Sequence, residues 1–406
     1  MRVLILGAGP AGLTVAERLR ELAPGLGQQC EITMVSAEPF PPYSPPAMAD
    51  YFLSGHRERL FWKGEGVCGR LGIDYRCGLH ARHLDADKQQ VEFSDGARLE
   101  YDRLVLATGS HPYTPLPGNE LEDVYNFKSL TAADALVKRS RLGEVTSAVV
   151  VGAGFIGVEV ALLLNDLGLE VTVIEQQTVM PRMLDDETAE MVRRALVARG
   201  ITVHLHTTAL SFCDLEGRAI GVVLDDGDML KADVYIAATG IKPNVDYLAG
   251  SGIDLNWGVP VDETLATNLP GVWAAGDIAE TADRMTGERY VHAIWPNATA
   301  QGRIVAERLL GYETVYEGAE AMNSLRHLGL PLIAAGSVEG DEELRVCHSG
   351  TLRKIVLTDN RIVGYRLAGD THGAGIYRSL MLKKADVSRF RHELLDPRFG
   401  VGKLAA

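Results

Sequence analysis

Two stretches of this chain repeat one pattern, an apolar run followed by three closely spaced glycines. VLILGAGPAGLTVA occupies residues 3–16, and VVVGAGFIGVEVA occupies residues 149–161. Because the chain has 43 glycines in 406 residues, such spacing arises readily by chance. The sequence around each match must therefore decide whether it is a real motif. A third match, Gly64, Gly66 and Gly69 in WKGEGVCGR, has no β-branched strand before it, so we expect a loop there.

The two repeats, by contrast, each lie within a predicted strand, turn, helix and second strand. RVLIL precedes the first turn, a helix is predicted over residues 13–22, and a strand EITMV begins at Glu31. AVVV precedes the second turn, a helix extends to about Leu167, and EVTVIE ends at Glu175. In a dinucleotide-binding fold the first glycine allows the tight turn, the second lets backbone approach a pyrophosphate, and the third lets helix pack on strand.

The sequence therefore predicts two dinucleotide sites. The positions predicted around the first pyrophosphate are Gly7, Gly9, Pro10, Ala11 and Gly12, and those around the second are Gly152, Gly154, Phe155, Ile156 and Gly157. Glu175 stands where a carboxylate accepts hydrogen bonds from a ribose diol. No arginine follows before Arg182 to meet a 2′-phosphate, which favours NAD over NADP. In the first site Ser36 has this place, and Glu38 is the predicted ribose ligand.

Four further segments occur in an order that resembles the FAD-dependent pyridine nucleotide–disulfide oxidoreductase family. YDRLVLATGSHP (101–112) and VYIAATGIKPN (234–244) are similar to the paired turns where that family's chain crosses between its FAD and NAD domains. TNLPGVWAAGD (267–277) is similar to the second FAD motif, and WPNATAQG (295–302) to the helix start that faces the flavin. The resemblance implies FAD contacts from Ala107, Thr108, Gly109, Gly276, Asp277 and Trp295, and an NAD contact from Gly240.

The resemblance implies an α/β fold with two Rossmann-like dinucleotide-binding domains, for FAD and NAD, and a small C-terminal α/β domain. The expected domains are residues 1–112 and 240–316 for FAD, 113–239 for NAD, and 317–406 for an interface domain. The cofactors themselves would carry out the hydride transfer, so we expect no catalytic group other than the flavin. Glu159 matches a glutamate near the nicotinamide in the family. It is otherwise a polar residue on an apolar helix, and the cost of burying an unpaired acid favours the functional interpretation.

The segment after the first motif lacks the redox cysteines of this family's disulfide reductases, peroxidases and many oxidases. Residues 38–56 read EPFPPYSPPAMADYFLSGH, so no thiol relay can take electrons from a flavin there. The segment is similar to the rubredoxin, ferredoxin and nitrite-reductase-like branch, but Pro45 and Asp50 replace an arginine and a lysine that are usual in it. The five cysteines have no metal-ligand spacing, and no metal site is expected.

The last 90 residues resemble the small C-terminal domain of the same branch. Residues 351–395 read as two strands joined by an Asp-Asn turn and followed by a helix. They are also similar to the FAD subunits of multi-component enzymes such as phenylglyoxylate dehydrogenases and tungsten aldehyde oxidoreductases. This likeness implies a permanent subunit of a larger complex, running toward NAD reduction.

Charge is unevenly distributed along the chain. The net charge of −14 argues against a nucleic-acid partner, yet residues 345–406 hold twelve Lys and Arg against five Asp and Glu. Small iron–sulfur carriers are usually acidic, so this basic region would attract one; alternatively it only solvates a surface or mediates self-association. The basic residues considered for docking are Arg353, Lys354, Arg378, Lys383, Lys384, Arg389, Arg391 and Arg398.

The sequence start does not resemble a signal peptide, and the most apolar window, residues 147–165, reads as a buried strand and helix rather than a membrane span. We therefore expect a soluble, cytoplasmic FAD enzyme with no membrane partner. It would exchange electrons between NAD(H) and an iron–sulfur or rubredoxin-like partner, as the NAD-reducing subunit of a larger complex. Two alternatives stay open: a stand-alone flavin NADH oxidase, and an NAD-sensing flavoprotein without turnover.

Overall fold

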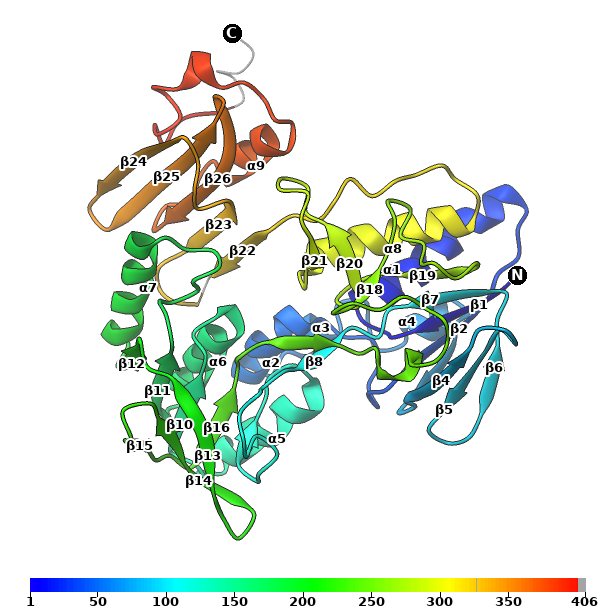
Figure 1. The fold of residues 1–406 in the computed structure, drawn as a ribbon, viewed down its shortest axis with the longest axis horizontal. Helices are drawn as coiled ribbons and strands as arrows, with labels where there is room; N and C mark the ends of the chain where they lie inside the picture. Colours follow the sequence, from blue (N-terminus) through cyan, green and yellow to red (C-terminus); the bar gives the residue numbers. More distant parts are fainter. Residues whose placement is uncertain (326, 401–406) are drawn as a thin grey trace. The chain divides into compact units, whose positions relative to one another are not determined.

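The computed structural model describes residues 1–400 apart from residue 326 (Figure 1). The chain forms two compact units, and each of them is discontinuous in sequence. The first unit contains residues 1–111 and 241–320, and the second contains residues 112–240 and 321–406. The segment expected to form a C-terminal domain therefore belongs to the same unit as residues 112–240. Its last six residues lie outside the described part of the chain.

The first unit is built on a five-stranded parallel sheet with the strand order β19, β7, β1, β2, β3. Its strands are β1 (Arg2–Leu6), β2 (Glu31–Ser36), β3 (Asp74–Cys77), β7 (Arg103–Leu106) and β19 (Val272–Ala274). The central strands β1 and β7 are buried beyond their first residue. Continuous apolar runs such as RVLIL suit strands that are covered on both faces.

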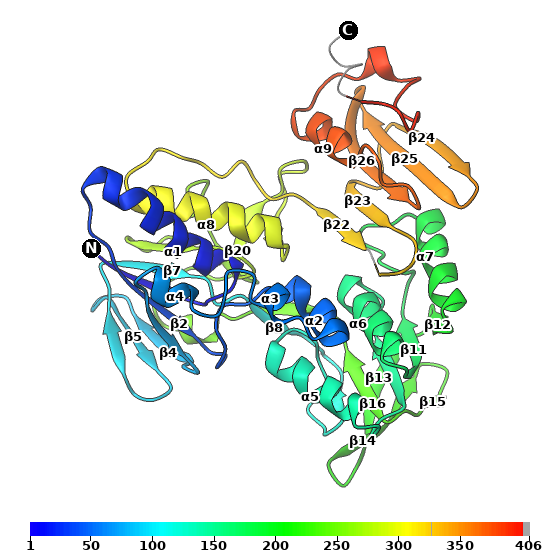
Figure 2. The same cartoon turned by 180° about the vertical axis from the view of Figure 1, so that it is seen from behind.

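Two long helices of this unit, α1 (Pro10–Leu22) and α8 (Trp295–Leu309), pack side by side (Figure 1 and Figure 2). Helix α1 begins three residues before the predicted start, because Gly9 is its N-cap and proline is favourable in the first helical turn. The unit also contains the strands β4 (Ala81–Asp85), β5 (Gln90–Phe93), β6 (Arg98–Glu100), β8 (Ser110–Pro112), β17 (Ile241–Pro243), β18 (Val259–Pro260), β20 (Ala279–Ala282) and β21 (Arg289–Val291).

The short helices of the first unit follow α1, the second strand β2 and the crossing between the units. They are η1 (Ala23–Leu26), η2 (Pro45–Ala47), α2 (Met48–Ser54), α3 (Arg57–Leu60), α4 (Val67–Arg70) and η3 (Asp246–Leu248). Gly64 and Gly66 of the third glycine match lie in a loop, as expected, whereas Gly69 lies in the single turn of α4. There Gly64 has a φ of +78° and packs near the Arg70 guanidinium.

The second unit repeats the parallel sheet, with the strand order β12, β11, β10, β16, β9. Its strands are β9 (Val124–Tyr125), β10 (Ser147–Val151), β11 (Glu170–Glu175), β12 (Thr202–Leu205) and β16 (Val234–Ala237). Its helices are α5 (Leu130–Arg141), α6 (Phe155–Asp166) and α7 (Asp186–Ala198). An antiparallel sheet adds β13 (Ala209–Leu215), β14 (Arg218–Leu224) and β15 (Met229–Leu230).

The C-terminal part of this unit is an antiparallel sheet with the strand order β22, β23, β26, β25, β24. Its elements are β22 (Met322–Leu325), β23 (Leu332–Gly336), β24 (Glu342–His348), β25 (Thr351–Thr358), β26 (Arg361–Ala368), α9 (Ala374–Leu382) and η4 (Ser388–Phe390). The predicted strand pair and helix are confirmed as β25, β26 and α9. Asp359 and Asn360 both have positive φ, which a two-residue hairpin turn requires.

One hydrophobic core of the second unit joins the parallel sheet to the C-terminal sheet. Val179, Met180 and Leu184, from the segment after β11, are buried in it together with Leu332 and Leu352 of the C-terminal sheet. The C-terminal sheet is therefore packed against the segment between β11 and α7 by apolar contacts. This packing holds β22 to β26 next to the second predicted dinucleotide site.

Candidate functional site

The first glycine motif forms a tight turn between β1 and α1. Gly7 has a φ of +111°, and a Cβ atom there would lie 2.0 Å from the Ala107 carbonyl oxygen. A Cβ on Gly12 would lie 2.0 Å from the Gly7 carbonyl oxygen. A Cβ on Gly9, however, would meet no protein atom within 4 Å. The protein's own packing thus requires Gly7 and Gly12, whereas at Gly9 the open space fits a group that approaches the backbone from outside.

The second motif has the same geometry between β10 and α6. A Cβ on Gly152, whose φ is +107°, would lie 2.5 Å from the Ala238 carbonyl oxygen, and one on Gly157 would lie 1.9 Å from the Gly152 carbonyl oxygen. Gly154 again faces open space. Ala107 and Ala238 both begin an Ala-Thr-Gly sequence, so each predicted crossing segment supplies the carbonyl against which the first glycine of one motif packs.

Both helices that follow these turns begin without a capping side chain. Gly9 is the N-cap of α1 and Gly154 the N-cap of α6, and neither helix has a side-chain hydrogen bond at its cap. Phe155 and Ile156 form the start of α6, as Pro10 and Ala11 do in α1. Backbone N–H groups at such an end favour an anion through hydrogen bonding and the helix dipole. Both turns therefore fit the pyrophosphate of a dinucleotide.

The predicted acids lie near the carboxyl ends of the second strands. Glu38 follows β2 by two residues, and its carboxylate accepts hydrogen bonds from the Tyr43 hydroxyl at 2.9 and 3.1 Å. Glu175 is the last residue of β11 and is buried. Its Oε2 accepts a hydrogen bond from the Ala153 N–H at 2.8 Å, and its Oε1 accepts one from the Gln177 N–H at 3.0 Å. Glu175 is thus fixed against the second glycine turn.

The second FAD motif and α8 meet the first glycine motif at Ala11. A Cβ on Gly302 would lie 2.6 Å from the Ala11 carbonyl oxygen, and one on Gly276 would lie 3.1 Å from the Ala11 Cβ. The buried Gln301 accepts a hydrogen bond from the Gly276 N–H at 2.7 Å. Segments almost 300 residues apart therefore share one corner of the first unit, as binding of a single FAD requires.

Asp277 and the first Ala-Thr-Gly segment adjoin this corner. The Ser110 hydroxyl donates to Asp277 Oδ2 at 2.8 Å. Gly109 has a φ of +68°, and its carbonyl accepts from the Asn244 N–H at 3.0 Å. The Asn244 side chain donates to the Thr108 carbonyl at 2.8 Å. Ser110, Asn244, Tyr43 and Gln301 are not among the predicted site residues, although each lies within a segment that resembles the family.

Trp295 is the first residue of α8 and is half-buried against a second tryptophan. The rings of Trp62 and Trp295 meet edge to face, with centroids 4.9 Å apart and an interplanar angle of 71°. Trp62 lies just before the loop of the third glycine match, which holds no cofactor motif. Arg70 at the end of α4 donates a hydrogen bond to the Lys63 carbonyl in this loop. This hydrogen bond closes the loop that follows Trp62.

Glu159 lies on α6 and is exposed within its unit, so the expectation that it would be a costly buried acid is wrong. Its contact with nicotinamide stays a prediction. Gly240 has a φ of +158°, and its carbonyl accepts from the Tyr113 N–H at 2.9 Å. Within residues 1–325 and 327–400, no group of three or more His, Cys, Asp or Glu side chains is placed to hold a metal ion. No helix in these residues is long and apolar enough to cross a membrane.

Part of the expected docking surface is not available to a partner. Arg353 and Lys354 are buried, so assigning them to a docking surface is wrong. Their carboxylate partners lie within the same unit, because Arg353 binds Asp370 and Lys354 binds Asp185. Alternation along β25 directs these two neighbours to opposite faces of the sheet.

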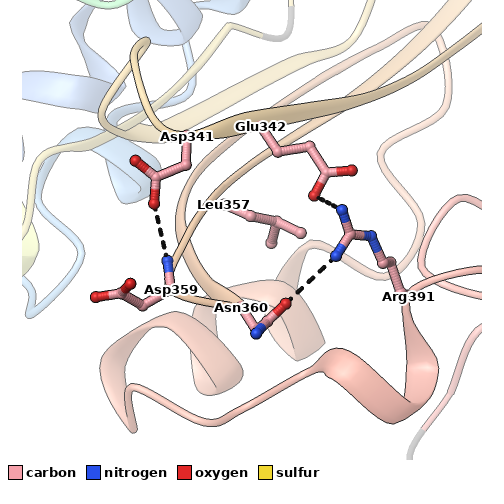
Figure 3. Close-up of a pocket in the computed structure, with 6 residues that line it drawn as sticks. All are labelled: Asp341, Glu342, Leu357, Asp359, Asn360 and Arg391. Carbon is pink, nitrogen blue, oxygen red and sulfur yellow. Dashed lines mark hydrogen bonds and ion pairs between the residues drawn. The ribbon is translucent and has the colours of Figure 1, made fainter.

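Arg391 also has partners within the C-terminal part of the chain. It lines a small cavity there together with Asp341, Glu342, Leu357, Asp359 and Asn360 (Figure 3). Its guanidinium binds the Glu342 carboxylate and donates to Asn360 Oδ1 at 3.3 Å. The Asp359 N–H donates to Asp341 Oδ2 at 3.1 Å. Arg391 is therefore bonded to two other residues that line this cavity and has a structural role.

Comparison with known proteins identifies the family. A family model described as pyridine nucleotide-disulphide oxidoreductase matches residues 1–302. The chain belongs to this family. It is 31% identical, over 99% of its length and 96% of the relative's, to the NADH-dependent phenylglyoxylate dehydrogenase subunit epsilon of Aromatoleum evansii. It is 30% identical to an NADH oxidase of Methanocaldococcus jannaschii, over 78% of this chain and 71% of that protein.

The solved structures agree with the family assignment. The ferredoxin reductase for the CYP199A2 system from Rhodopseudomonas palustris matches with a TM-score of 0.89 and 28% identity, and all of both chains is covered. The predicted α/β fold with two Rossmann-like domains is confirmed. As a family member the chain is an FAD-dependent NAD(H) oxidoreductase, as the sequence predicted. When bound, FAD and NAD(H) supply the hydride transfer between nicotinamide and flavin. The residues described above fit the task of binding and orienting these two cofactors.

The glycine geometry predicts opposite outcomes for two alanine substitutions in the first motif. We expect Gly9→Ala to leave the fold intact and to weaken FAD binding by about tenfold or more, because its Cβ occupies space meant for the cofactor. We expect Gly12→Ala to destabilise the apoprotein by about 1–3 kcal/mol, because its Cβ overlaps the Gly7 carbonyl. Flavin content and thermal unfolding of the apoproteins measure the two effects. Equal unfolding temperatures for both variants would contradict this account.

The position of Glu175 predicts the nucleotide preference. We expect the wild-type protein to be reduced by NADH far better than by NADPH. Glu175→Ala combined with Gln176→Arg removes the carboxylate that is predicted to bind a ribose diol and adds a cation for a 2′-phosphate. The preference for NADH over NADPH should therefore narrow. Stopped-flow reduction of the flavin by each nucleotide measures it. Glu38→Ala is the matched control and should leave the preference unchanged, whereas a wild-type preference for NADPH would overturn the assignment.

Proposed function

We propose that this chain exchanges electrons between NAD(H) and an iron–sulfur or rubredoxin-like protein, as the NAD-reducing flavin subunit of a larger oxidoreductase complex. The observation that carries the proposal is the absence of cysteine from residues 38–56, where the disulfide-reducing members of the family have their redox pair. In the structure this segment contains η2 and α2. Without a thiol in that segment, the flavin needs a redox group outside the segment with which to exchange electrons.

Four of the five cysteines, all outside that segment, do not suit a thiol relay. Cys30 and Cys68 are buried, and burial raises the pKa of both thiols, that of Cys68 to about 11. They are therefore protonated at neutral pH and poor nucleophiles. Cys77 and Cys347 are exposed, on β3 and β24 in different units. This distribution supports direct transfer from the flavin to an external carrier.

The extent of the similarity also supports the subunit proposal. The relative from Aromatoleum evansii is named as one subunit of a dehydrogenase, and the match covers nearly all of both chains. The match to the ferredoxin reductase structure likewise includes the C-terminal segment. The C-terminal part is thus shared with a protein whose name specifies a ferredoxin partner. The cytoplasmic location expected from the sequence stays a prediction.

The docking surface that we propose is smaller than the one expected from charge alone. Lys383, Lys384, Arg389 and Arg398 are exposed on the segment around α9 and η4. Arg378 is half-buried on α9, and Arg398 has Asp396 as a partner at 3.2 Å. Complementary charge on this segment would steer an acidic carrier and raise its association rate at low salt.

A stand-alone NADH oxidase is the second candidate, and the similarity to the archaeal NADH oxidase favours it. The two functions predict different behaviour of the purified FAD-loaded protein. As an electron-transfer subunit it should consume NADH slowly in air and faster, by about tenfold or more, when a ferredoxin or rubredoxin is added. Oxygen uptake and NADH absorbance measure both rates. Fast turnover in air that no carrier accelerates would reject our proposal in favour of the oxidase.

The docking proposal predicts a charge effect on one step alone. Changing Lys383, Lys384 and Arg389 to Glu should slow reduction of an acidic carrier at low salt by about tenfold and leave flavin reduction by NADH unchanged. The control is the double variant Lys138→Glu and Arg141→Glu, on α5 of the same unit. It tests whether negative charge added elsewhere also slows reduction of the carrier. Stopped-flow rates at several salt concentrations measure both steps. Carrier reduction at wild-type speed and salt dependence would exclude this segment as the docking site.

A further inference from the structure

Four polar side chains form a straight row across the C-terminal sheet. In the strand register Asn323 lies opposite Ala334, Ala334 opposite Arg366, Arg366 opposite Lys354, and Lys354 opposite Arg345. Residues directly opposite each other in antiparallel strands point to the same face of the sheet. The row therefore presents an amide and three cations from β22, β26, β25 and β24 on one face. We call Asn323, Arg366, Lys354 and Arg345 the donor row.

The centre of the donor row binds the segment that leads from β11 into α7. Arg366 donates through Nε to the Met183 carbonyl at 2.9 Å, and Lys354 binds Asp185 Oδ1 at 2.7 Å. Asp185 is the N-cap of α7, where its side chain accepts from the Thr188 N–H. The two central cations thus hold both the backbone of this segment and the start of the helix.

The ends of the donor row bind the same short stretch. The Asn323 amide donates to the Met183 sulfur at 2.9 Å. Lys354 reaches Glu187 at 3.0 Å, and Arg345 binds the same carboxylate. All four members of the row therefore contact residues 183–187.

The two central cations are almost completely buried. Arg366 is 1% exposed and Lys354 is 6% exposed. Besides Met183, the Arg366 guanidinium binds the carbonyls of Ala335, Gly336 and Ser337. Burial lowers the pKa of Arg366 to about 10, so the group stays charged at neutral pH. A buried cation is costly unless it is well bonded, so residues 183–187 are held firmly in place.

The other end of the same segment is bonded to the second glycine turn. The Met180 N–H donates to the Ala153 carbonyl at 2.9 Å, while the Ala153 N–H donates to Glu175. Met183 and Leu184 donate their N–H groups to the Met180 carbonyl at 3.0 and 3.1 Å. A continuous path of hydrogen bonds therefore runs from the donor row through Met183 and Met180 to Ala153 and Glu175.

We infer that the donor row, with Lys354 at its centre, positions the NAD-binding turn and its ribose carboxylate through residues 176–187. Lys354 is a positioning residue, since it contacts the segment and not the cofactor. The inference rests on the assignment of Gly152 to Gln177 to the NAD site, and it does not depend on which partner accepts electrons. It predicts that a change in the C-terminal sheet alters nucleotide affinity.

The test measures binding of ADP-ribose to the FAD-loaded full-length protein by titration calorimetry. ADP-ribose contains the pyrophosphate and the adenosine ribose but no nicotinamide, so binding is read without hydride transfer. Lys354→Met should weaken ADP-ribose binding roughly fivefold to tenfold, a usual size for coupling between sites. It should also raise the KM for NADH and leave kcat unchanged. Asp185→Asn keeps a capping side chain, and its effect should not add to that of Lys354→Met, because the two residues share one interaction.

Arg353→Met is the matched control. Arg353 is the neighbouring buried cation on β25, is 4% exposed, and binds Asp370 and the Tyr377 hydroxyl on the other face of the sheet. It should cost similar stability and leave ADP-ribose affinity unchanged. An unchanged affinity in folded Lys354→Met, or equal losses in both variants, would overturn the inference and show that the row only fastens the sheet.

Two further variants keep the test decisive. Arg345 lies at one end of the donor row, and its side chain is 46% exposed. The Arg345→Gln variant should therefore fold even if the Lys354→Met variant does not. It should weaken ADP-ribose about twofold, a small loss for an exposed ion pair; no change in this folded variant would count against the inference. Glu175→Ala reports on the site assignment separately. If it leaves ADP-ribose affinity unchanged, the assignment of the NAD site is wrong, and the inference fails with it.

Discussion

In each unit, the first glycine of the glycine turn packs against a backbone carbonyl just after the neighbouring strand. This contact sets the geometry of both predicted cofactor sites. Strand β7 lies beside β1, and β16 lies beside β10, all in parallel. Each neighbouring strand therefore ends at the same edge as the glycine turn, and its Ala-Thr-Gly segment abuts the first glycine. A side chain on Gly7 or Gly152 would push the neighbouring segment away. Each repeated motif thus forms one side of a contact. The other side is an Ala-Thr-Gly segment that lies about 90 to 100 residues later in the chain.

Close packing at small residues also explains how motifs that are far apart in the sequence lie together in the first unit. Ala11 in α1 is so close to Gly302 that a larger residue at Gly302 would push α1 away from α8, and Gly276 contacts the same alanine from the loop after β19. The close packing of α1 and α8 allows Gln301 to reach the Gly276 backbone. Close contacts between small residues therefore hold the glycine segments that are predicted to bind FAD. This accounts for the dense glycine and alanine content of the motifs.

In the second unit, some of the basic residues are buried and stabilise the interior of the molecule. The C-terminal region is rich in basic residues, yet Arg366 and Lys354 are among the most buried polar side chains in the described part of the chain. Arg366 donates to main-chain carbonyls of Met183 and of residues 335–337, and Lys354 binds Asp185. A count of charges along the sequence does not distinguish such cations from solvated ones, because both have the same composition. This is why the docking surface expected from charge alone included residues that cannot contact a partner.

The sequence by itself determined the two glycine turns, the strands and helices on either side of them, and the position of Glu175 at a strand end, because local spacing and apolar periodicity encode these features. It also determined the hairpin at Asp359 and Asn360, whose residue types favour positive φ. It did not reveal β22, β23 and β24, whose mixed polar and apolar pattern is recognisable only against a partner strand. The tertiary structure alone decided that Trp62 packs on Trp295, that Glu159 is exposed, and that Lys354 reaches Asp185. These facts depend on which distant segments contact each other. Strand pairing and core packing decide those contacts, and the local order of residues does not reveal them.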